Sequence, residues 1–223
     1  QKKNNINILD IGCNDGTLLK CFPKNIERYG IDPSQIIMKV KNKKIKLIRD
    51  FFPLKRNHTL KNKKFDLITS IAMFYDLDDP SIFVKNIKSN LKKNGIWIFE
   101  LSYLIDMLKL NSFDTICLEH LEYYSLHSLN FLMQKYNLKI FKISKNSING
   151  GSIRCFVTHK DNLSYDKKTN YNLCNKLLLN EKRLKIRDKY IYDKFVLSIN
   201  NIKKKLFNKI NNILKNKETI YVL

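Results

Sequence analysis

The sequence has no long hydrophobic run. Among its 223 residues no apolar stretch approaches the ~18 residues that a membrane-spanning helix requires. No apolar segment near the N-terminus has the pattern of a signal peptide. Hydrophobic residues still make up 43% of the chain, which is enough for a packed core and excludes a chain that is disordered throughout. We therefore expect a soluble, cytoplasmic protein that does not bind a membrane.

Closely spaced cysteines are also missing. The five cysteines stand far apart and form no Cys-x-x-Cys pair; they are Cys13, Cys21, Cys117, Cys155 and Cys174. An odd, scattered set predicts neither a disulfide framework nor a structural zinc site. Reduced thiols in a cytosolic compartment fit this pattern best, and we expect no bound metal.

Arginine is scarce for so basic a chain. The formal net charge is +22, yet only six of the 42 basic residues are arginines: Arg28, Arg49, Arg56, Arg154, Arg183 and Arg187. Clustered cations attract a phosphate backbone, but arginine is the side chain whose fork shape best suits phosphates and base edges. The lysines accompany abundant Asn and Ile, which indicates a compositional drift over the whole sequence. We expect solvated lysine faces rather than a nucleic-acid partner.

Short apolar runs alternate with amphipathic stretches over the first 100 residues. This alternation is typical of a parallel sheet covered by helices. The amphipathic stretches predict helices at 16–22 and 81–91, and Gly95 is expected to end the second. The apolar runs predict strands at 7–11, 29–31, 45–48, 65–71 and 96–101.

The pattern changes beyond residue 101. Ser125 is expected to cap a helix that carries Leu129, Leu132, Met133 and Tyr136 on one face. Two strands, 139–144 and 152–158, follow it. Asn149-Gly150-Gly151 between them tolerate positive φ and permit a tight reversal. The fold class predicted is α/β, a Rossmann-like, mostly parallel sheet that ends in an antiparallel hairpin.

Glycine and proline are absent from Asp161 onward. Apolar residues recur there at helical spacing and predict one or two long helices, whereas Lys203-Lys204-Lys205 reads as a solvated face and 217–223 as one more strand. We expect two units, a domain over 1–160 and a helical extension over 161–223. The second would be the start of a truncated C-terminal domain, and the chain a fragment of a longer protein.

The sharpest motif follows the first predicted strand. Asp10-Ile11-Gly12-Cys13-Asn14-Asp15-Gly16 forms a glycine-bearing turn that opens a helix, so a ligand can approach the backbone closely. Gly12 and Gly16 are four apart and Asn14 stands where a second glycine would be, so this is not the dinucleotide fingerprint. A generic nucleotide-binding turn is the alternative.

Acidic residues end the next two strands. Asp32 could chelate a ribose diol with its two carboxylate oxygens. Asp50-Phe51 supplies an acceptor for an exocyclic amine and an aromatic face for a purine. The three elements stand in register along the predicted sheet.

Together these motifs, over residues 6–158, resemble the class I methyltransferases that use S-adenosylmethionine. The resemblance implies that Asp10, Gly12, Asn14, Asp15 and Gly16 surround the methionine part of the cofactor, that Asp32 holds the ribose, and that Asp50 and Phe51 hold the adenine. Ser70 ends a strand whose exit, Met73-Phe74-Tyr75, lines the methyl-transfer cleft in that family; core packing is the alternative for Met73 and Phe74.

A second block, 114–126, places His120 between carboxylates and tyrosines. Histidine titrates near neutrality, so it can take a proton from a carbon activated by a ketone, and a carboxylate can orient it. With Glu100-Leu101-Ser102-Tyr103 and Asn149-Gly150-Gly151-Ser152 the block resembles the sugar C-methyltransferases. By position this implies His120 as base with Glu119 beside it. A hydrogen bond from His120 to the substrate and a purely structural role for this histidine stay open as alternatives. The residues then expected at the substrate are Tyr103, Tyr123, Tyr124, Asn149 and Gly151.

Two departures from that family are visible. Cys117-Leu118 stands where the family commonly has Tyr-His, and its N-terminal zinc-binding module is absent from these residues. The other histidines, His58, His127 and His159, are expected at the surface.

The function predicted is C-methylation of a nucleotide-linked keto-deoxysugar through an enolate, with S-adenosylmethionine as methyl donor. Two alternatives stay open: an O- or N-methyltransferase of another small metabolite, and a non-catalytic module that binds the cofactor or RNA. Salt-dependent RNA binding would identify the last.

Overall fold

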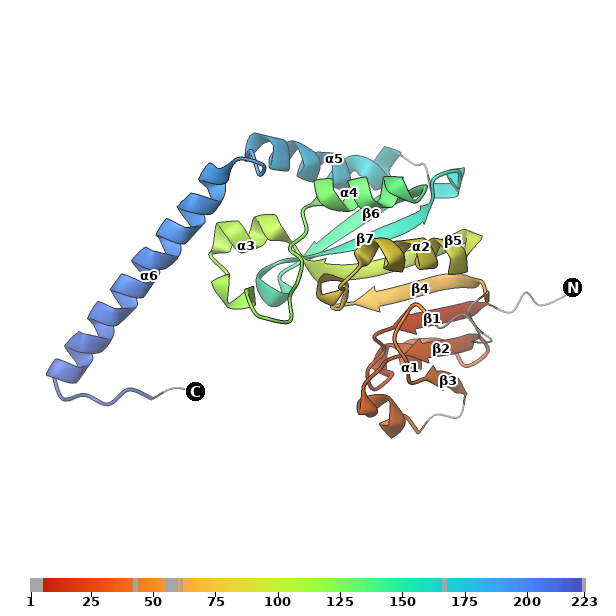
Figure 1. Ribbon diagram of the computed structural model, residues 1–223, viewed down its shortest axis with the longest axis horizontal. Coiled ribbons are helices and arrows are strands. Elements are labelled where there is room, and N and C mark those ends of the chain that lie inside the picture. Colours follow the sequence, from red (N-terminus) through yellow and green to blue (C-terminus); the bar gives the residue numbers. More distant parts are fainter. Residues whose placement is uncertain (1–5, 42–43, 55–59, 61, 166–167, 222–223) are drawn as a thin grey trace, which may run out of the picture.

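The fold is built on one seven-stranded sheet. The computed structural model describes residues 6–41, 44–54, 60, 62–165 and 168–221. The strand order is β3-β2-β1-β4-β5-β7-β6; the first five strands run parallel, and β7 runs antiparallel to both neighbours (Figure 1). The strands are β1 (Asn7–Ile11), β2 (Glu27–Ile31), β3 (Ile45–Ile48), β4 (Phe65–Ile71), β5 (Leu91–Ser102), β6 (Leu138–Asn146) and β7 (Ser152–His159).

The predicted α/β fold with a terminal antiparallel hairpin is therefore confirmed. Helices pack along the sheet, α1 on β2, α2 on β5, and both α4 and α5 on β6. The α4 helix begins as expected at Ser125, whose hydroxyl accepts from the Ser128 amide in a capping box. The helices are α1 (Thr17–Cys21), α2 (Pro80–Asn90), α3 (Leu104–Leu110), α4 (Leu126–Lys135), α5 (Lys168–Arg183) and α6 (Lys189–Lys215).

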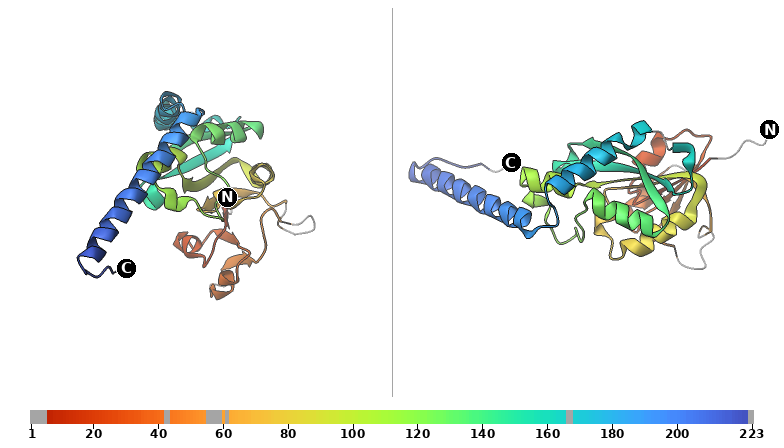
Figure 2. Two further views of the ribbon diagram at one scale, coloured as in Figure 1. Left: turned by 60° about the vertical axis from the view of Figure 1, so that its left-hand side comes forward. Right: turned by 90° about the horizontal axis from the view of Figure 1, so that it is seen from above.

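Two long helices end the described chain, as the spacing of apolar residues predicted. The first, α5, lies against the body, whereas α6 runs outward from it (Figures 1 and 2). Only the first part of α6 is anchored, because Phe195 packs on Met107 and Leu108 of α3. The strand predicted at 217–223 is wrong for residues 217–221, which pair with no strand of the sheet. Residues 222–223 lie outside the described residues. A strand needs a neighbouring strand for its backbone hydrogen bonds, and this segment follows the far end of α6.

Gly95 does not end a helix. The α2 helix stops at Asn90 and β5 begins at Leu91, so Gly95 lies inside a strand. A Cβ at this position would lie 2.9 Å from the carbonyl oxygen of Phe65, next to a register shift between β4 and β5. The glycine thus permits a close approach of two backbones at a bulge.

The core is centred on the middle strands and is rich in aromatic rings. Phe74, Trp97 and Phe99 are fully buried, with ring centroids 5.2 Å apart for Phe74–Phe99 and 4.5 Å apart for Trp97–Phe99. Phe74 is therefore a core residue, the alternative that the sequence left open. Met73, its neighbour, is only partly buried.

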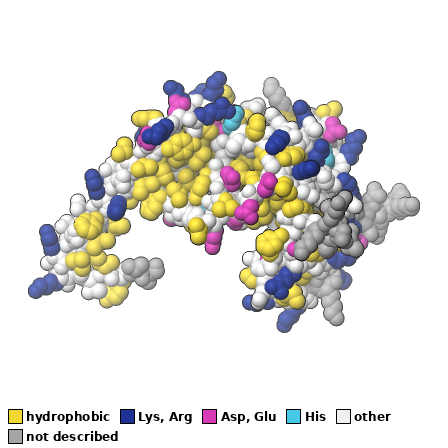
Figure 3. Space-filling model, in the orientation of Figure 1, with side chains coloured by type: hydrophobic (Ala, Val, Ile, Leu, Met, Phe, Trp, Pro, Cys, Tyr) yellow, Lys and Arg dark blue, Asp and Glu magenta, His cyan; other side chains and the backbone are white. Residues whose placement is uncertain are grey.

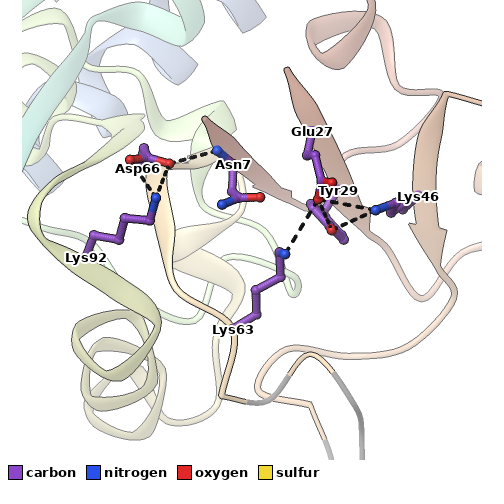
Figure 4. Close-up of polar contacts among 7 residues, drawn as sticks. All are labelled: Asn7, Glu27, Tyr29, Lys46, Lys63, Asp66 and Lys92. Atoms are coloured by element: carbon purple, nitrogen blue, oxygen red, sulfur yellow. Dashed lines mark hydrogen bonds and ion pairs between the residues drawn. The ribbon is translucent and has the colours of Figure 1, made fainter. Parts of the chain in front are cut away.

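Lysine side chains at the amino ends of the strands pair with acids. Lys46 and Lys63 lie 3.2 and 3.6 Å from Glu27, and Lys92 lies 2.8 Å from Asp66 (Figure 4). Such solvent-accessible pairs contribute about 0–1 kcal/mol each. These weak contacts accord with lysine side chains that are hydrated at the protein surface.

No helix in the described part of the chain combines the length and hydrophobicity needed to cross a membrane.

Candidate active site

The turn after β1 brings the backbone to the carboxyl edge of the sheet. Gly12 and Gly16 both adopt left-handed φ, 73° and 70°, and the amide of Gly12 donates to the carbonyl of Ile31 at 2.8 Å. A Cβ on Gly12 would lie 3.2 Å from Cγ of Met73. Glycine is favoured here because the positive φ strains any other residue and because a Cβ would crowd the Met73 side chain.

Asp32 is a buried carboxylate held by the same turn. Its oxygens accept from the Asn14 amide at 2.8 Å, from the Ser34 amide at 2.9 Å and from the Ser34 hydroxyl at 2.5 Å. Burial acts to raise the pKa of Asp32, but these hydrogen bonds outweigh it and hold the pKa below its ordinary value. Asp32 is therefore an ionised acceptor at neutral pH. Ser34 was not singled out by the sequence, although an acid followed two residues later by Ser is a common local turn.

Asp10 is more deeply buried, with 3% of its surface exposed. Thr69 on β4 donates its hydroxyl to Asp10 at 2.6 Å. Burial raises the pKa of Asp10 to about 6, against the opposing effect of the Thr69 hydrogen bond and with a contribution from the charge of Asp32. The carboxyl group of Asp10 consequently changes its charge just below neutral pH.

A cavity of about 520 Å³ opens beside these residues. Its walls include four of the nine residues expected at the cofactor, namely Gly12, Asp32, Asp50 and Phe51. Met73 lines it as well, as the position after β4 predicted. Three further aspartates, Asp76, Asp78 and Asp79, also line it, so the cavity has an acidic wall that favours a cationic ligand.

Two residues expected at the cofactor have other partners. Asp15 is exposed and accepts from the amide and hydroxyl of Thr17 at 3.0 and 2.9 Å, in a local turn just before α1, whose N-cap is Gly16. Ser70 is fully buried, and its hydroxyl accepts from the indole nitrogen of Trp97 at 2.9 Å. Both side chains thus contribute to local structure.

The loop that carries His120 packs over the short turn Phe74–Asp76. The His120 ring lies 4.4 Å from the ring of Tyr75, and the Glu122 amide donates to the Tyr75 carbonyl at 3.1 Å. Nδ1 of His120 lies 2.7 Å from the carbonyl oxygen of Thr115. Because a carbonyl can only accept, this contact assigns the proton to Nδ1 and leaves Nε2 as the basic nitrogen.

Asp76 connects this loop to the cavity. It lines the cavity and interacts electrostatically with both His120 and Glu119. Asp76 is itself exposed at the surface, as Glu119 is; its partial desolvation raises the pKa of the carboxyl group, the charge of His120 opposes that rise, and Glu119 adds to it. No local sequence signal marks Asp76, because it precedes His120 by more than forty positions. Glu119, the carboxylate expected beside His120, is exposed.

The three expected substrate tyrosines differ in their surroundings. Tyr123 donates to the Thr115 carbonyl that also contacts His120, at 3.3 Å. Tyr124 packs on Phe74, and its buried hydroxyl has no hydrogen-bond partner among the described residues. Tyr103 is 1% exposed and donates to Glu181 of α5 at 2.7 Å. Tyr103 is therefore committed to the core rather than to a cavity wall.

The glycine-rich hairpin turn lies against α3. Asn149 is exposed with φ of 51°, whereas Gly151 is buried and a Cβ on it would lie 2.6 Å from Cβ of Asp106. Gly150 faces Ser112, just before the His120 loop. The hairpin turn therefore adjoins the segment that leads to His120.

Comparisons with known proteins agree with this geometry. The family described as "Methyltransferase domain" matches residues 1–143, and the family described as "C-methyltransferase C-terminal domain" matches residues 147–223. The chain belongs to the class I, S-adenosylmethionine-dependent methyltransferases.

Individual relatives support the same conclusion. This methyltransferase is 27% identical over 154 residues to the C-methyltransferase NovU of Streptomyces niveus, an alignment that covers 67% of this chain and 37% of that protein. The chain thus spans little more than a third of the length of this relative.

Solved structures share the fold. The plantazolicin methyltransferase BpumL, in complex with an analogue and SAH, is 16% identical with a TM-score of 0.55, covering 71% of this chain and 78% of that one. A putative methyltransferase in complex with the Trm112 activator of Haloferax volcanii is 15% identical with a TM-score of 0.56, covering 70% and 83%.

The methyltransferase shows no ready metal site in its described residues, where no three His, Cys, Asp or Glu side chains are placed to hold an ion. His127 is exposed and His159 half-buried, while His58 lies outside the described residues. Among the described histidines, His120 is the one that contacts Tyr75, whose neighbour Asp76 lines the cavity.

Proposed function

We propose that this methyltransferase methylates a carbon atom next to a ketone, in a keto-deoxysugar linked to a nucleotide. The observation that carries the proposal is the basic Nε2 of His120, left free by the Nδ1 contact with Thr115 and linked to the cofactor cavity through Asp76. The match of residues 147–223 to a C-methyltransferase C-terminal domain supports it, as does the similarity to a C-methyltransferase.

The residues around the cavity fit S-adenosylmethionine. Asp32 keeps unused lone pairs for a ribose diol, because a carboxylate can accept about four hydrogen bonds and the three described ones are at 2.5, 2.8 and 2.9 Å. Phe51 is 72% exposed and lines the cavity with Asp50, where the pair can hold an adenine by stacking and one hydrogen bond. Gly12 leaves space that a Cβ would fill. When bound, the cofactor supplies an electrophilic methyl group.

His120 would act as the general base. Its Nε2 would take the proton from the carbon next to the ketone and leave an enolate. The enolate carbon would form the new C–C bond to the methyl group as the methyl–sulfur bond breaks, and the electron pair of that bond would leave with S-adenosylhomocysteine. The negative charge of Asp76 stabilises the imidazolium that forms, just as it responds to His120 in the free protein. Most of the acceleration would come from holding the two reacting carbons in near-attack geometry.

Hydrogen–deuterium exchange at the substrate carbon tests this directly. In deuterated buffer without cofactor, the wild-type chain should exchange the proton next to the ketone of a nucleotide-linked keto-deoxysugar. His120→Gln should abolish both exchange and methylation while S-adenosylhomocysteine binds with nearly unchanged affinity. His159→Gln, at the opposite edge of the sheet beside Leu91, is the matched control and should exchange normally.

Two results would contradict the proposal. If His120→Gln exchanges within a few-fold of wild type, His120 is not the base. If the wild type methylates oxygen or nitrogen acceptors and exchanges no carbon-bound proton, the chain is a methyltransferase of a different acceptor class.

A further inference from the structure

A second cavity lies where α3, α5 and α6 meet. Its volume is about 800 Å³, and its floor is formed by Ile105 and Leu108 of α3 and Phe195 of α6. The floor residues are buried, whereas the rim residues Lys109, Arg183 and Lys194 are exposed. The cavity is therefore an apolar hollow with a charged rim, distinct from the cofactor cavity.

The rim carries an excess of positive charge. Lys109, Arg183, Lys185 and Lys194 line the cavity, against the single acid Asp188. None of the four cations forms an ion pair or a side-chain hydrogen bond within the described part of the chain. In contrast, Lys46, Lys63 and Lys92 at the amino edge of the sheet all have acidic partners. Unpaired cations around a hollow favour an anionic ligand.

The two cavities are electrostatically opposite. Five aspartates line the cofactor cavity: Asp32, Asp50, Asp76, Asp78 and Asp79. They suit a sulfonium cation and repel a diphosphate. In Figure 3, acidic side chains gather beside the hydrophobic side chains that cover α3, while Lys and Arg side chains gather over α5 and along α6. A substrate that carries a diphosphate therefore needs its anionic part away from the aspartates.

We infer that the cavity at the junction of α3, α5 and α6 binds the nucleoside diphosphate part of the substrate. This inference rests on the proposed function and assigns the nucleotide end of the same substrate. Arg183 can hold a phosphate with its planar fork, and the lysines supply point charges. Tyr190 lines the cavity with 75% of its surface exposed, which leaves an aromatic face on which a base can stack.

The cavity is connected to the His120 loop through one side chain. Tyr123 packs in the same cluster as Leu108, Phe195 and Ile191, which line the cavity. The Tyr123 hydroxyl donates to the carbonyl of Thr115, the group that also contacts His120. A substrate anchored by its nucleotide at the junction can therefore extend its sugar past Tyr123 toward the base.

Titration of the chain with dTDP, UDP and inorganic pyrophosphate tests the inference. The double variant Arg183→Gln/Lys194→Gln removes two rim charges and should weaken dTDP binding at least about tenfold. A hydrogen bond to a charged group contributes more to the binding free energy than a neutral one. The control, Lys203→Gln with Lys204→Gln, removes the same charge from the exposed part of α6 and should change affinity less than about twofold. Tyr190→Ala should weaken dTDP binding and leave pyrophosphate binding unchanged. Unchanged binding of S-adenosylhomocysteine verifies the fold of each variant.

Failure of this inference differs from failure of the proposed function. The inference is overturned if the wild type binds none of the three probes, or if both double variants lose affinity equally, which would indicate only a general attraction to a basic chain. If the rim variant alone loses dTDP while the wild type exchanges no carbon-bound proton, the nucleotide site stands and the C-methylation proposal falls. If the wild type exchanges the carbon-bound proton and the rim variant keeps the wild-type KM for the nucleotide-linked sugar, the C-methylation proposal stands and the nucleotide site falls.

Discussion

The phenol of Tyr103 donates a hydrogen bond of 2.7 Å to the carboxylate of Glu181, 78 positions further along the chain. The same carboxylate accepts from the amides of Leu126 and His127 at 2.7 and 2.9 Å. These two amides belong to the first turn of α4, where helix geometry leaves them without a partner. One buried acid of α5 therefore fastens the helical extension to the end of the His120 loop.

Replacement of Glu181 by Ala should destabilise the protein by about 2–4 kcal/mol, because two buried donors and one partly buried donor would lose their acceptor. Chemical denaturation measures the change in the free energy of unfolding. Lys182→Ala alters the exposed neighbour and should stay within about 0.5 kcal/mol of wild type. Equal stability of the two variants would show that the Glu181 contacts are energetically unimportant.

Replacement of Asp76 by Asn should slow proton exchange at the substrate carbon about tenfold, since the imidazolium of His120 would lose a nearby negative charge. Glu119→Gln changes an exposed carboxylate and should leave the rate within about twofold of wild type. Rates at saturating substrate separate this effect from binding. A slow Glu119→Gln variant beside a normal Asp76→Asn variant would instead make Glu119 the partner of the base, as the sequence suggested.

Replacement of Asp32 by Asn should weaken the binding of S-adenosylhomocysteine about 10- to 100-fold, because a charged acceptor for the ribose would be lost. Calorimetric titration gives the affinity directly. Asp15→Asn serves as the control, since the Asp15 carboxylate bonds the amide and hydroxyl of Thr17; its affinity should match wild type. An Asp32→Asn affinity within twofold of wild type would remove Asp32 from the ribose site.

Replacement of Asp10 by Asn should stabilise the protein at neutral pH. The pKa of Asp10 is about 6 in the folded state against an ordinary 3.8, so the folded state binds more protons between these values. Stability therefore falls as pH rises from about 4 to 6 and remains lower above that range. Asp10→Asn should match wild type near pH 4 and exceed its free energy of unfolding by about 1–3 kcal/mol at pH 7.

Denaturation curves between pH 4 and 7 test this, with the exposed Asp78→Asn variant as the control for the pH slope. A wild type as stable as Asp10→Asn at every pH would disprove the buried charge. Asp10→Asn should also bind S-adenosylhomocysteine more weakly than wild type if the Asp10 carboxylate contacts the cofactor.

Local patterns predicted the sheet well where a run of residues was apolar on both faces. The strands at 7–11 and 65–71 coincide with β1 and β4, most of whose residues are buried, because buried parallel strands need nearly continuous hydrophobic side chains. The strand at 45–48 coincides with β3, although Lys46 is exposed there. Gly95 and 217–221 show the limit. A glycine such as Gly95 can either end a helix or allow a neighbouring strand to approach closely. The segment 217–221 could form a strand only if another strand lay beside it. Both outcomes depend on residues far away in the chain.

For the site, local chemistry indicated Gly12 and Asp32, whose conformation and hydrogen bonds arise within a few residues or between adjacent strands. The roles of Ser70 and Tyr103 could not be predicted from their neighbours, since Trp97 and Glu181 take up their hydroxyl groups. Asp76 and Glu181 had no local signal at all. The role expected for His120 stays a prediction until exchange is measured.

The sequence by itself determined the family, the order of the elements and the turn after β1, because glycine spacing and apolar periodicity act over a few residues. Only the tertiary structure decided which carboxylates line the cavity beside the β1 turn and interact with His120, and which cations remain unpaired around the junction of α3, α5 and α6. Those features depend on distances between segments that are far apart in the chain, and packing alone sets such distances.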